Sequence, residues 1–115
     1  MEFFIPKSEA IFEEEIKKSR FITYLRHTEG MEQSKAFLAE IKALHPSARH
    51  WCWATVAGMP TDSQQYSFSD DGEPSGTAGK PMLSYLLGSG LGEITAVVVR
   101  YYGGILLGTG GLVKA

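Results

Sequence analysis

The segment from Glu93 to Tyr102, EITAVVVRYY, is an almost continuous run of apolar residues. A short apolar run without polar alternation is typical of a central strand that is buried on both faces. Arg100 stands near the end of the run, and such a charge must be paired or must face a cleft, because burying an isolated charge is costly. Tyr101 and Tyr102 are expected to pack in the core, with stacking on nucleic-acid bases as the alternative.

The chain has the size of one domain, and its net charge does not indicate any class of binding partner. It has 115 residues, of which 43% are hydrophobic and 21% are charged, as in ordinary globular proteins. The formal net charge is -2, which does not draw the whole chain to nucleic acid or to a membrane. Binding to RNA would therefore require a local basic patch.

Cysteine usage and the N-terminus favour a cytoplasmic protein. Cys52 is the single cysteine, so an internal disulfide is excluded, and its place between Trp51 and Trp53 predicts a core thiol rather than a nucleophile. The N-terminus has no signal-peptide pattern, and the most apolar segment, Ile94 to Val99, is too short to span a bilayer.

Apolar spacing and turn residues predict the other elements. Helical spacing is clearest from Met31 to Leu44, and β-prone residues predict strands over His50–Ala57 and Gln65–Phe68. Pro81 is expected to open a second helix that Gly88 closes. The apolar residues at helical spacing in the first helix are Phe37, Leu38, Ile41 and Leu44, and the second helix is expected to carry Met82, Tyr85, Leu86 and Leu87.

The two ends of the chain are less regular. From Ser8 to Lys18, glutamate and lysine favour a helix, whereas a strand beginning at Arg20 follows, so propensity leaves the first segment undecided. Gly103 to Gly111 is a glycine loop, and Leu112 to Ala115 has the composition of a helix start. A chain that stops there lacks the element expected to cover its last strand, which predicts a fragment. Mixed helices and strands indicate the α+β class.

The run from Ser69 to Pro81, SDDGEPSGTAGKP, is the expected functional centre. Glycines let the backbone approach a ligand, and amides at a helix start can converge on an anion. The run is not the phosphate loop of nucleotide hydrolases, because Pro74 and Pro81 stand where that loop needs Gly and Ser or Thr. Tight turns and an anion site both remain open. The anion-binding candidates are Gly76, Thr77, Gly79 and Lys80.

Three carboxylates, Asp70, Asp71 and Glu73, accompany the glycines. Aspartate side chains commonly cap helices and stabilise turns, so loop stabilisation is the favoured role. Metal binding and acid–base catalysis are the alternatives. The spacing does not match a calcium loop, and no metal or cofactor is assigned.

Basic residues from other segments extend the anion-binding hypothesis. Arg49 and His50 begin a predicted strand, and Arg100 ends the central one. Arg100 is expected either to pair with the carboxylates of the glycine run or to bind a phosphate. No serine or cysteine lies in a recognisable nucleophile turn, so no catalytic residue is assigned. His27 and His45 are expected in loops or on the surface.

Five segments together carry a family resemblance. From about Glu14 to its last residue, the chain resembles the N-terminal domain of the IMPACT family, and the long stretch DDGEPSGTAGKP makes the match specific. The five segments are Ser19–Phe21, Ala48–His50, Ser69–Pro81, Val99–Gly104 and Leu107–Ala115.

The resemblance implies a two-layer α+β sandwich like the second domain of a small-subunit ribosomal protein, with a strand over Ser8 to Lys18. Bacterial members usually continue into a helix and then into a ferredoxin-like domain. Residues 1–115 are therefore expected to be one IMPACT N-terminal-type domain, truncated at its C-terminal end and without the ferredoxin-like domain. Eukaryotic members resemble regulators of translation, and the family offers no established catalytic residue.

These observations favour a non-enzymatic binding domain that acts in translation or its regulation, with RNA, the ribosome or a translation-regulatory protein as partner. An enzyme acting on a small phosphorylated metabolite, with Asp70 or Glu73 as base or metal ligand, is one alternative. A protein-interaction module is another. Convergence of Lys80, Arg100 and His50 on an open surface would support anion binding, whereas their burial against the carboxylates would indicate a structural motif.

Overall fold

The computed structural model of the chain describes residues 4–16, 18–72 and 78–102. Its elements are β1 (Ala10–Ile16), β2 (Ser19–His27), α1 (Gly30–Leu44), β3 (His50–Val56), a 3-10 turn (Ser63–Gln65), β4 (Tyr66–Ser69), α2 (Gly79–Ser89) and β5 (Ile94–Tyr102). Several residues of the sequence-based predictions lie outside this part. They are Glu73, Gly76 and Thr77 of the glycine run, the loop from Gly103 and the helix expected from Leu112.

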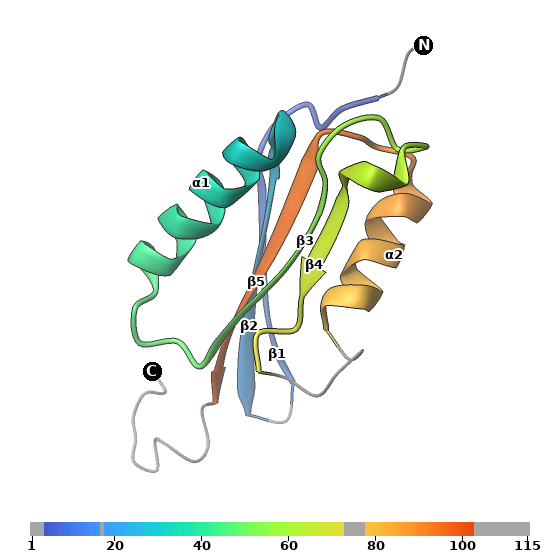
Figure 1. Cartoon of the computed structure of the whole chain (residues 1–115). Coiled ribbons are helices and arrows are strands. Elements are labelled where there is room, and N and C mark those ends of the chain that lie inside the picture. Colours follow the sequence, from blue (N-terminus) through green and yellow to red (C-terminus); the bar gives the residue numbers. More distant parts are fainter. Residues whose placement is uncertain (1–3, 17, 73–77, 103–115) are drawn as a thin grey trace.

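Strand β5 lies at the centre of the sheet (Figure 1). The strand order is β1-β2-β5-β3-β4, and all pairings are antiparallel. Val97 and Val99 of β5 are fully buried. The predicted α+β class and the predicted central strand at Glu93–Tyr102 are therefore confirmed.

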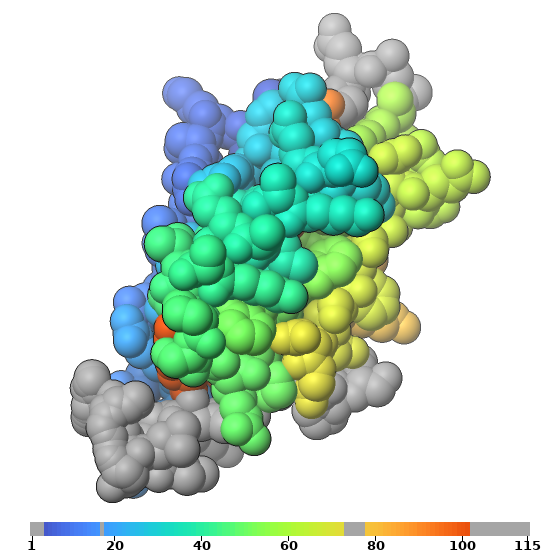
Figure 2. Space-filling model, turned by 60° about the vertical axis from the view of Figure 1, so that its left-hand side comes forward, coloured from blue at the N-terminus to red at the C-terminus, as the bar shows by residue number. Residues whose placement is uncertain are grey.

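The two helices cover opposite faces of the sheet (Figure 1). Phe37 and Ile41 of α1 cluster with Val97, whereas Leu86 of α2 clusters with Ala96. Successive residues of a strand point to opposite faces, so the sheet has an α1 face and an α2 face. Figure 2 shows α1 lying across the α1 face. Over the described residues, the expected two-layer sandwich is wrong, because a central strand that is apolar on both sides needs cover on both.

The start of α1 is fixed to the sheet by buried hydroxyl groups. Ser34 Oγ lies 2.9 Å from Thr55 Oγ1 and 2.8 Å from Thr95 Oγ1. Thr28 Oγ1 lies 2.7 Å from Thr95 Oγ1, and Thr55 Oγ1 donates to the Ile94 carbonyl at 3.1 Å. All four hydroxyl-bearing residues are buried. Their mutual hydrogen bonds satisfy groups that would otherwise be costly to bury, so they bind α1 to β3 and β5.

The end of α1 is fixed by a histidine. His45 Nε2 lies 2.6 Å from Tyr24 Oη, and His45 Nδ1 lies 2.6 Å from Tyr101 Oη. A neutral imidazole donates from one ring nitrogen and accepts at the other, so one tyrosine accepts and the other donates. His45 lies in the loop between α1 and β3, as expected, and it is half-buried there. Tyr101 packs against the core under α1, as predicted.

The undecided segment near the N-terminus forms β1. It pairs with β2 along its length. Lys18, which lies between the two strands, has a left-handed φ of 68°. Pairing with the sheet overrides the helix propensity of its glutamates, since propensity is a weak local preference. β1 is an edge strand, and its Phe12 and Ile16, which point toward the α2 face, are exposed.

The bounds of α2 differ from the prediction at both ends. The helix begins two residues before Pro81 and ends one residue after Gly88. Proline is tolerated in the first turn because the amides there have no intrahelical partner. Gly90, with a φ of 77°, ends the helix in the left-handed conformation. Two of the apolar residues of the helices, Leu44 and Tyr85, are exposed. Neither described helix is long and apolar enough to cross a membrane.

The buried hydroxyl network predicts a loss of stability when one member is removed. Thr95→Val keeps the shape of the side chain but leaves Thr28 and Ser34 with fewer partners in a buried site. We expect the free energy of unfolding to fall by about 1–3 kcal/mol, measured by urea denaturation. Thr23→Val is the matched control, because Thr23 is half-buried on the α2 face. It should change the free energy of unfolding by no more than about 0.5 kcal/mol. Equal losses in both variants would contradict the role of the network.

His45 predicts a dependence of stability on pH. Burial, and secondarily the charge of Arg20, hold the pKa of His45 below its ordinary value of 6.5. The unfolded chain therefore binds this proton more readily than the folded chain, so the stabilisation is complete above pH 6.5 and is lost as the pH falls below it. Urea unfolding across that range should show the decline, and His45→Gln should make it smaller. A decline of unchanged size in the variant would assign it to other groups.

Candidate functional site

Three of the predicted anion-binding residues lie where β3 begins and β5 ends. His50 and Arg100 are direct cross-strand partners, and the Arg49 amide donates to the Arg100 carbonyl at 2.8 Å. Directly opposite residues of an antiparallel pair point to the same face, so His50 and Arg100 lie side by side on the α2 face. Lys80 stands in the first turn of α2, and both Lys80 and Arg49 are exposed.

Asp70 fixes the start of α2. Its Oδ1 accepts hydrogen bonds from the Ala78 amide at 3.0 Å and from the Gly79 amide at 2.7 Å. Amides at a helix N-terminus lack intrahelical partners and favour a negative charge. The Asp70 carboxylate therefore occupies the place at these two amides where the sequence predicted an external anion.

Asp71 fixes the same loop to β3. Its Oδ2 accepts from the Trp51 amide at 2.8 Å, and its carbonyl accepts from His50 Nδ1 at 2.6 Å. A carbonyl can only accept, so the hydrogen bond places a proton on Nδ1. Asp71 has a left-handed φ of 46°, and Gly72 follows with a φ of 89°. A Cβ on Gly72 would lie 3.0 Å from His50 Cε1, so glycine permits this close approach.

Gly79 lets the start of α2 pack directly on the end of β4. A Cβ at this position would lie 2.7 Å from the Ser69 carbonyl oxygen and 2.9 Å from Phe68 Cδ1. A backbone oxygen cannot move aside as the end of a flexible side chain can. The glycine is therefore required by packing, independently of any ligand.

Arg100 is held toward β2. Its Nη2 donates to Ser19 Oγ at 3.3 Å, and its guanidinium carbon lies 5.2 Å from the centroid of the Phe21 ring. A guanidinium over an aromatic face is attracted by the ring quadrupole. These contacts hold the Arg100 side chain on the α2 face. Cys52, on the same face, is buried, and its thiol donates to the Asp70 carbonyl at 3.3 Å.

Four basic residues of the predicted anion-binding set lie in these elements or next to them. Arg49 and Lys80 are exposed, and His50 and Arg100 are half-buried beside the loop that Asp70 holds in place. We call Arg49, His50, Lys80 and Arg100 the cationic group. Arginine and lysine donate charge-assisted hydrogen bonds to phosphate oxygens, so the group is chemically suited to phosphates.

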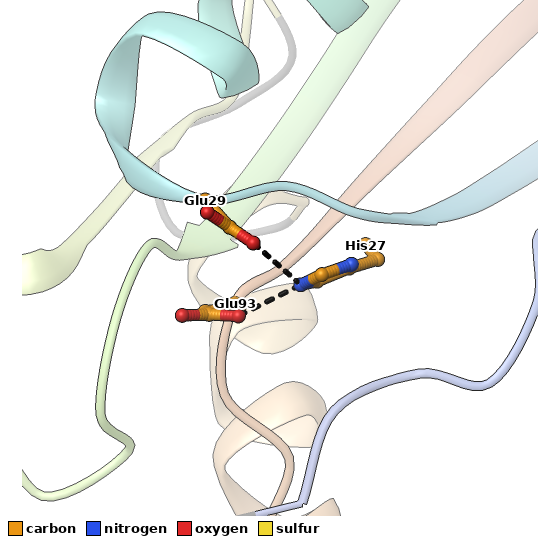
Figure 3. A group of neighbouring side chains, drawn as sticks. All are labelled: His27, Glu29 and Glu93. Atoms are coloured by element: carbon orange, nitrogen blue, oxygen red, sulfur yellow. Dashed lines mark hydrogen bonds and ion pairs between the residues drawn. The ribbon is translucent and has the colours of Figure 1, made fainter.

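A second polar group lies near the start of β5 and was missed by sequence reasoning. His27 ends β2, Glu29 is the N-cap residue of α1, and Glu93 directly precedes β5 (Figure 3). His27 Nε2 lies 2.7 Å from Glu93 Oε1 and 3.9 Å from Glu29 Oε2. His27 is the last residue of a strand rather than a loop residue, and its side chain is 33% exposed. His27 and Glu29 are close in sequence, but only the pairing of β2 with β5 brings Glu93 to them, so no local motif contains all three.

Comparison with known proteins gives a consistent set of relatives. Residues 17–115 match the family model described as the Impact N-terminal domain. The chain is 75% identical over 114 residues to an IMPACT family member of Haemophilus influenzae, covering 99% of the chain and 55% of that protein. It is 71% identical over 111 residues to the IMPACT family member YigZ of Escherichia coli, covering 96% and 54%. The chain thus spans about half the length of these relatives.

The likeness extends to a solved structure and to more distant relatives. The crystal structure of a hypothetical protein matches with a TM-score of 0.86 and 70% sequence identity, covering 98% of this chain and 55% of that one. The IMPACT family member YvyE of Bacillus subtilis is 44% identical over 113 residues, covering 98% of this chain and 51% of that protein.

The packing at Gly79 predicts opposite effects of alanine at two glycines of α2. Gly79→Ala should lower the free energy of unfolding by about 1–3 kcal/mol, because its Cβ would meet backbone atoms of Ser69. Gly88→Ala is the matched control. A Cβ there meets nothing within 4 Å, so alanine should raise the free energy of unfolding by about 0.5–1 kcal/mol. Urea denaturation of both variants tests the pair, and similar effects of the two would contradict the packing argument.

Proposed function

Because the chain belongs to the IMPACT family, we propose that it is a cytoplasmic, non-enzymatic binding domain that contacts phosphate groups of RNA and acts in translation or its regulation. The observation that carries the proposal is the meeting of Arg49, His50 and Arg100 at one end of the sheet, beside the loop that leads to Lys80. The likeness to a ribosomal-protein domain that the resemblance implied adds only a fold-level analogy.

The local charge makes RNA the favoured partner class. The chain as a whole has a net charge of -2, so attraction to a polyanion depends on a local concentration of cations. Arg49 and Lys80 are exposed, so their charges can reach phosphates that lie along the surface. Such contacts recognise the backbone and carry no sequence preference by themselves.

Side chains, rather than backbone amides, are the proposed contacts. Asp70 already accepts from the Ala78 and Gly79 amides, and a phosphate placed there would have to displace that carboxylate. We therefore assign Gly79 to packing. Gly76 and Thr77 remain candidates by sequence, and they lie outside the described residues.

The alternative of an enzyme on a small phosphorylated metabolite has less support. Asp70 was the candidate base among the described residues, and its Oδ1 holds the first amides of α2. Accepting a proton there would break the helix cap.

The alternative of a protein-interaction module would leave the cationic group without a role. Binding measurements with RNA across a salt series distinguish such a module from an RNA-binding domain.

RNA binding should depend on salt through individual cations. Arg49→Gln and Lys80→Gln should each weaken binding to a labelled single-stranded RNA, whatever its sequence. Each should also reduce the slope of log K against log salt concentration by about 0.7, the value for one phosphate contact. Fluorescence anisotropy across a salt series measures both effects, and ribosome co-sedimentation over the same series tests the larger partner.

Lys35→Gln is the matched control, because Lys35 is also exposed but lies on α1. It removes the same charge from a different surface and should leave the slope unchanged. Binding that is absent, insensitive to salt or reduced equally by all three substitutions would refute the proposal.

A further inference from the structure

We propose that His27, Glu29 and Glu93 form a binding site for a divalent transition-metal ion of the Zn²⁺ type. The three residues lie near the start of β5, whereas Arg100 lies near its end. Arg100 lies six positions after Ile94 along the strand, which corresponds to about 20 Å. The proposed metal site is therefore distinct from the cationic group and adds a second function to the domain.

Three donor atoms from separate parts of the fold converge on one point (Figure 3). They are one imidazole nitrogen and two carboxylate oxygens, which all lie within 4.8 Å of one another. Zinc binds such nitrogen and oxygen donors at about 2.0–2.2 Å, so neighbouring donors of a tetrahedral site lie about 3.3–3.6 Å apart. The separations from His27 Nε2, 2.7 Å to Glu93 and 3.9 Å to Glu29, lie on either side of this value. Small side-chain rotations would therefore complete the geometry.

The charge of the group favours a cation. His27 Nε2 can donate one hydrogen, and Glu93 Oε1 lies at hydrogen-bond distance to receive it. Glu29 Oε2, at 3.9 Å, is too far for a second hydrogen bond. When the imidazole is neutral, two carboxylates face each other across a few ångströms and repel. A divalent ion neutralises both carboxylates and uses the nitrogen lone pair as its third ligand.

The backbone holds the donors in place. The Thr28 amide donates to the Glu93 carbonyl at 2.9 Å, and the Glu93 amide donates to the Gly58 carbonyl at 3.1 Å. Glu93 keeps a left-handed φ of 51°, which is costly for a residue with a Cβ. Thr28, next to His27, belongs to the buried hydroxyl network under α1. A ligand set carried by rigid elements loses less entropy when it binds an ion.

The site is also accessible. The side chains of His27 and Glu93 are 33% and 26% exposed, and that of Glu29 is 63% exposed. An ion can therefore enter from solvent. Three protein ligands leave a fourth position of a tetrahedral ion for water or for a bound ligand, which is the arrangement of an open zinc site.

Glu29 separates the proposal from its main competitor. The competing interpretation is a simple ion pair between a protonated His27 and Glu93, in which Glu29 lies beyond contact distance. A metal site needs the Glu29 carboxylate, whereas the ion pair does not. Since Glu29 is largely exposed, Glu29→Gln also leaves the fold undisturbed.

Calorimetric titration of Zn²⁺ into the EDTA-treated 115-residue chain tests the site. We expect one saturable ion per chain and an affinity at least about tenfold weaker in Glu29→Gln and in His27→Gln, since loss of an outer-shell partner alone costs that much. Glu32→Gln is the matched control, because Glu32 is exposed in the first turn of α1 and outside the group. Its affinity should equal that of the unmodified chain.

Thermal unfolding gives a second readout. Zn²⁺ should raise the melting temperature relative to EDTA in the unmodified chain and in Glu32→Gln, and much less in Glu29→Gln. Absence of saturable binding would overturn the proposal. So would equal binding by the unmodified chain, Glu29→Gln and His27→Gln, which would mean an adventitious ion only. Arg49→Gln and Lys80→Gln should leave zinc binding unchanged, so failure of the RNA proposal would be a separate result.

Discussion

Strand β5 pairs with β2 on one edge and with β3 on the other, and the rest of the described structure depends on this double pairing. β1 and β2 form one antiparallel pair, and β3 and β4 form another. Only β5 joins the two pairs into one sheet. Because β5 is apolar on both faces, each face must be covered, and α1 and α2 supply that cover from opposite sides. The positions of both helices thus follow from the composition of one strand.

The same constraint places polar chemistry at the ends of β5. Its middle, from Ala96 to Val99, lies between two helices and has no room for an unpaired charge. Glu93 and Arg100 stand where the strand leaves this covered region, and each gathers polar residues from neighbouring elements. Glu93 meets His27 from β2, while Arg100 meets His50 from β3. The central strand therefore separates an acidic group at one end from a cationic group at the other.

Features written in a local pattern could be predicted from the sequence. The apolar run of β5 and the helical spacing of α1 were sufficient to locate both elements. Features that depend on partners far away could not. The glutamates of β1 favour helix, and pairing with β2 overrides them. His45, after α1, contacts Tyr24 of β2 and Tyr101 of β5 only when the helix packs on the sheet. His27 contacts Glu93 only when β2 pairs with β5. The partners in these hydrogen bonds are 21 to 66 residues apart in the sequence, so no periodic sequence pattern links them.

The glycine run illustrates how a sequence can resemble a ligand loop for structural reasons. Two of its glycines are required by close approach, since Gly72 faces His50 and Gly79 faces the backbone of Ser69. Asp70 and Asp71 supply acceptors for amides at the start of α2 and of β3. A glycine turn, a helix start and nearby carboxylates therefore need no external anion to account for them. In the RNA-binding role that we propose, the loop would contribute position, because it fixes the start of α2, where Lys80 stands, against the end of β4. Recognition by this domain would then rest on side chains that the loop holds in place.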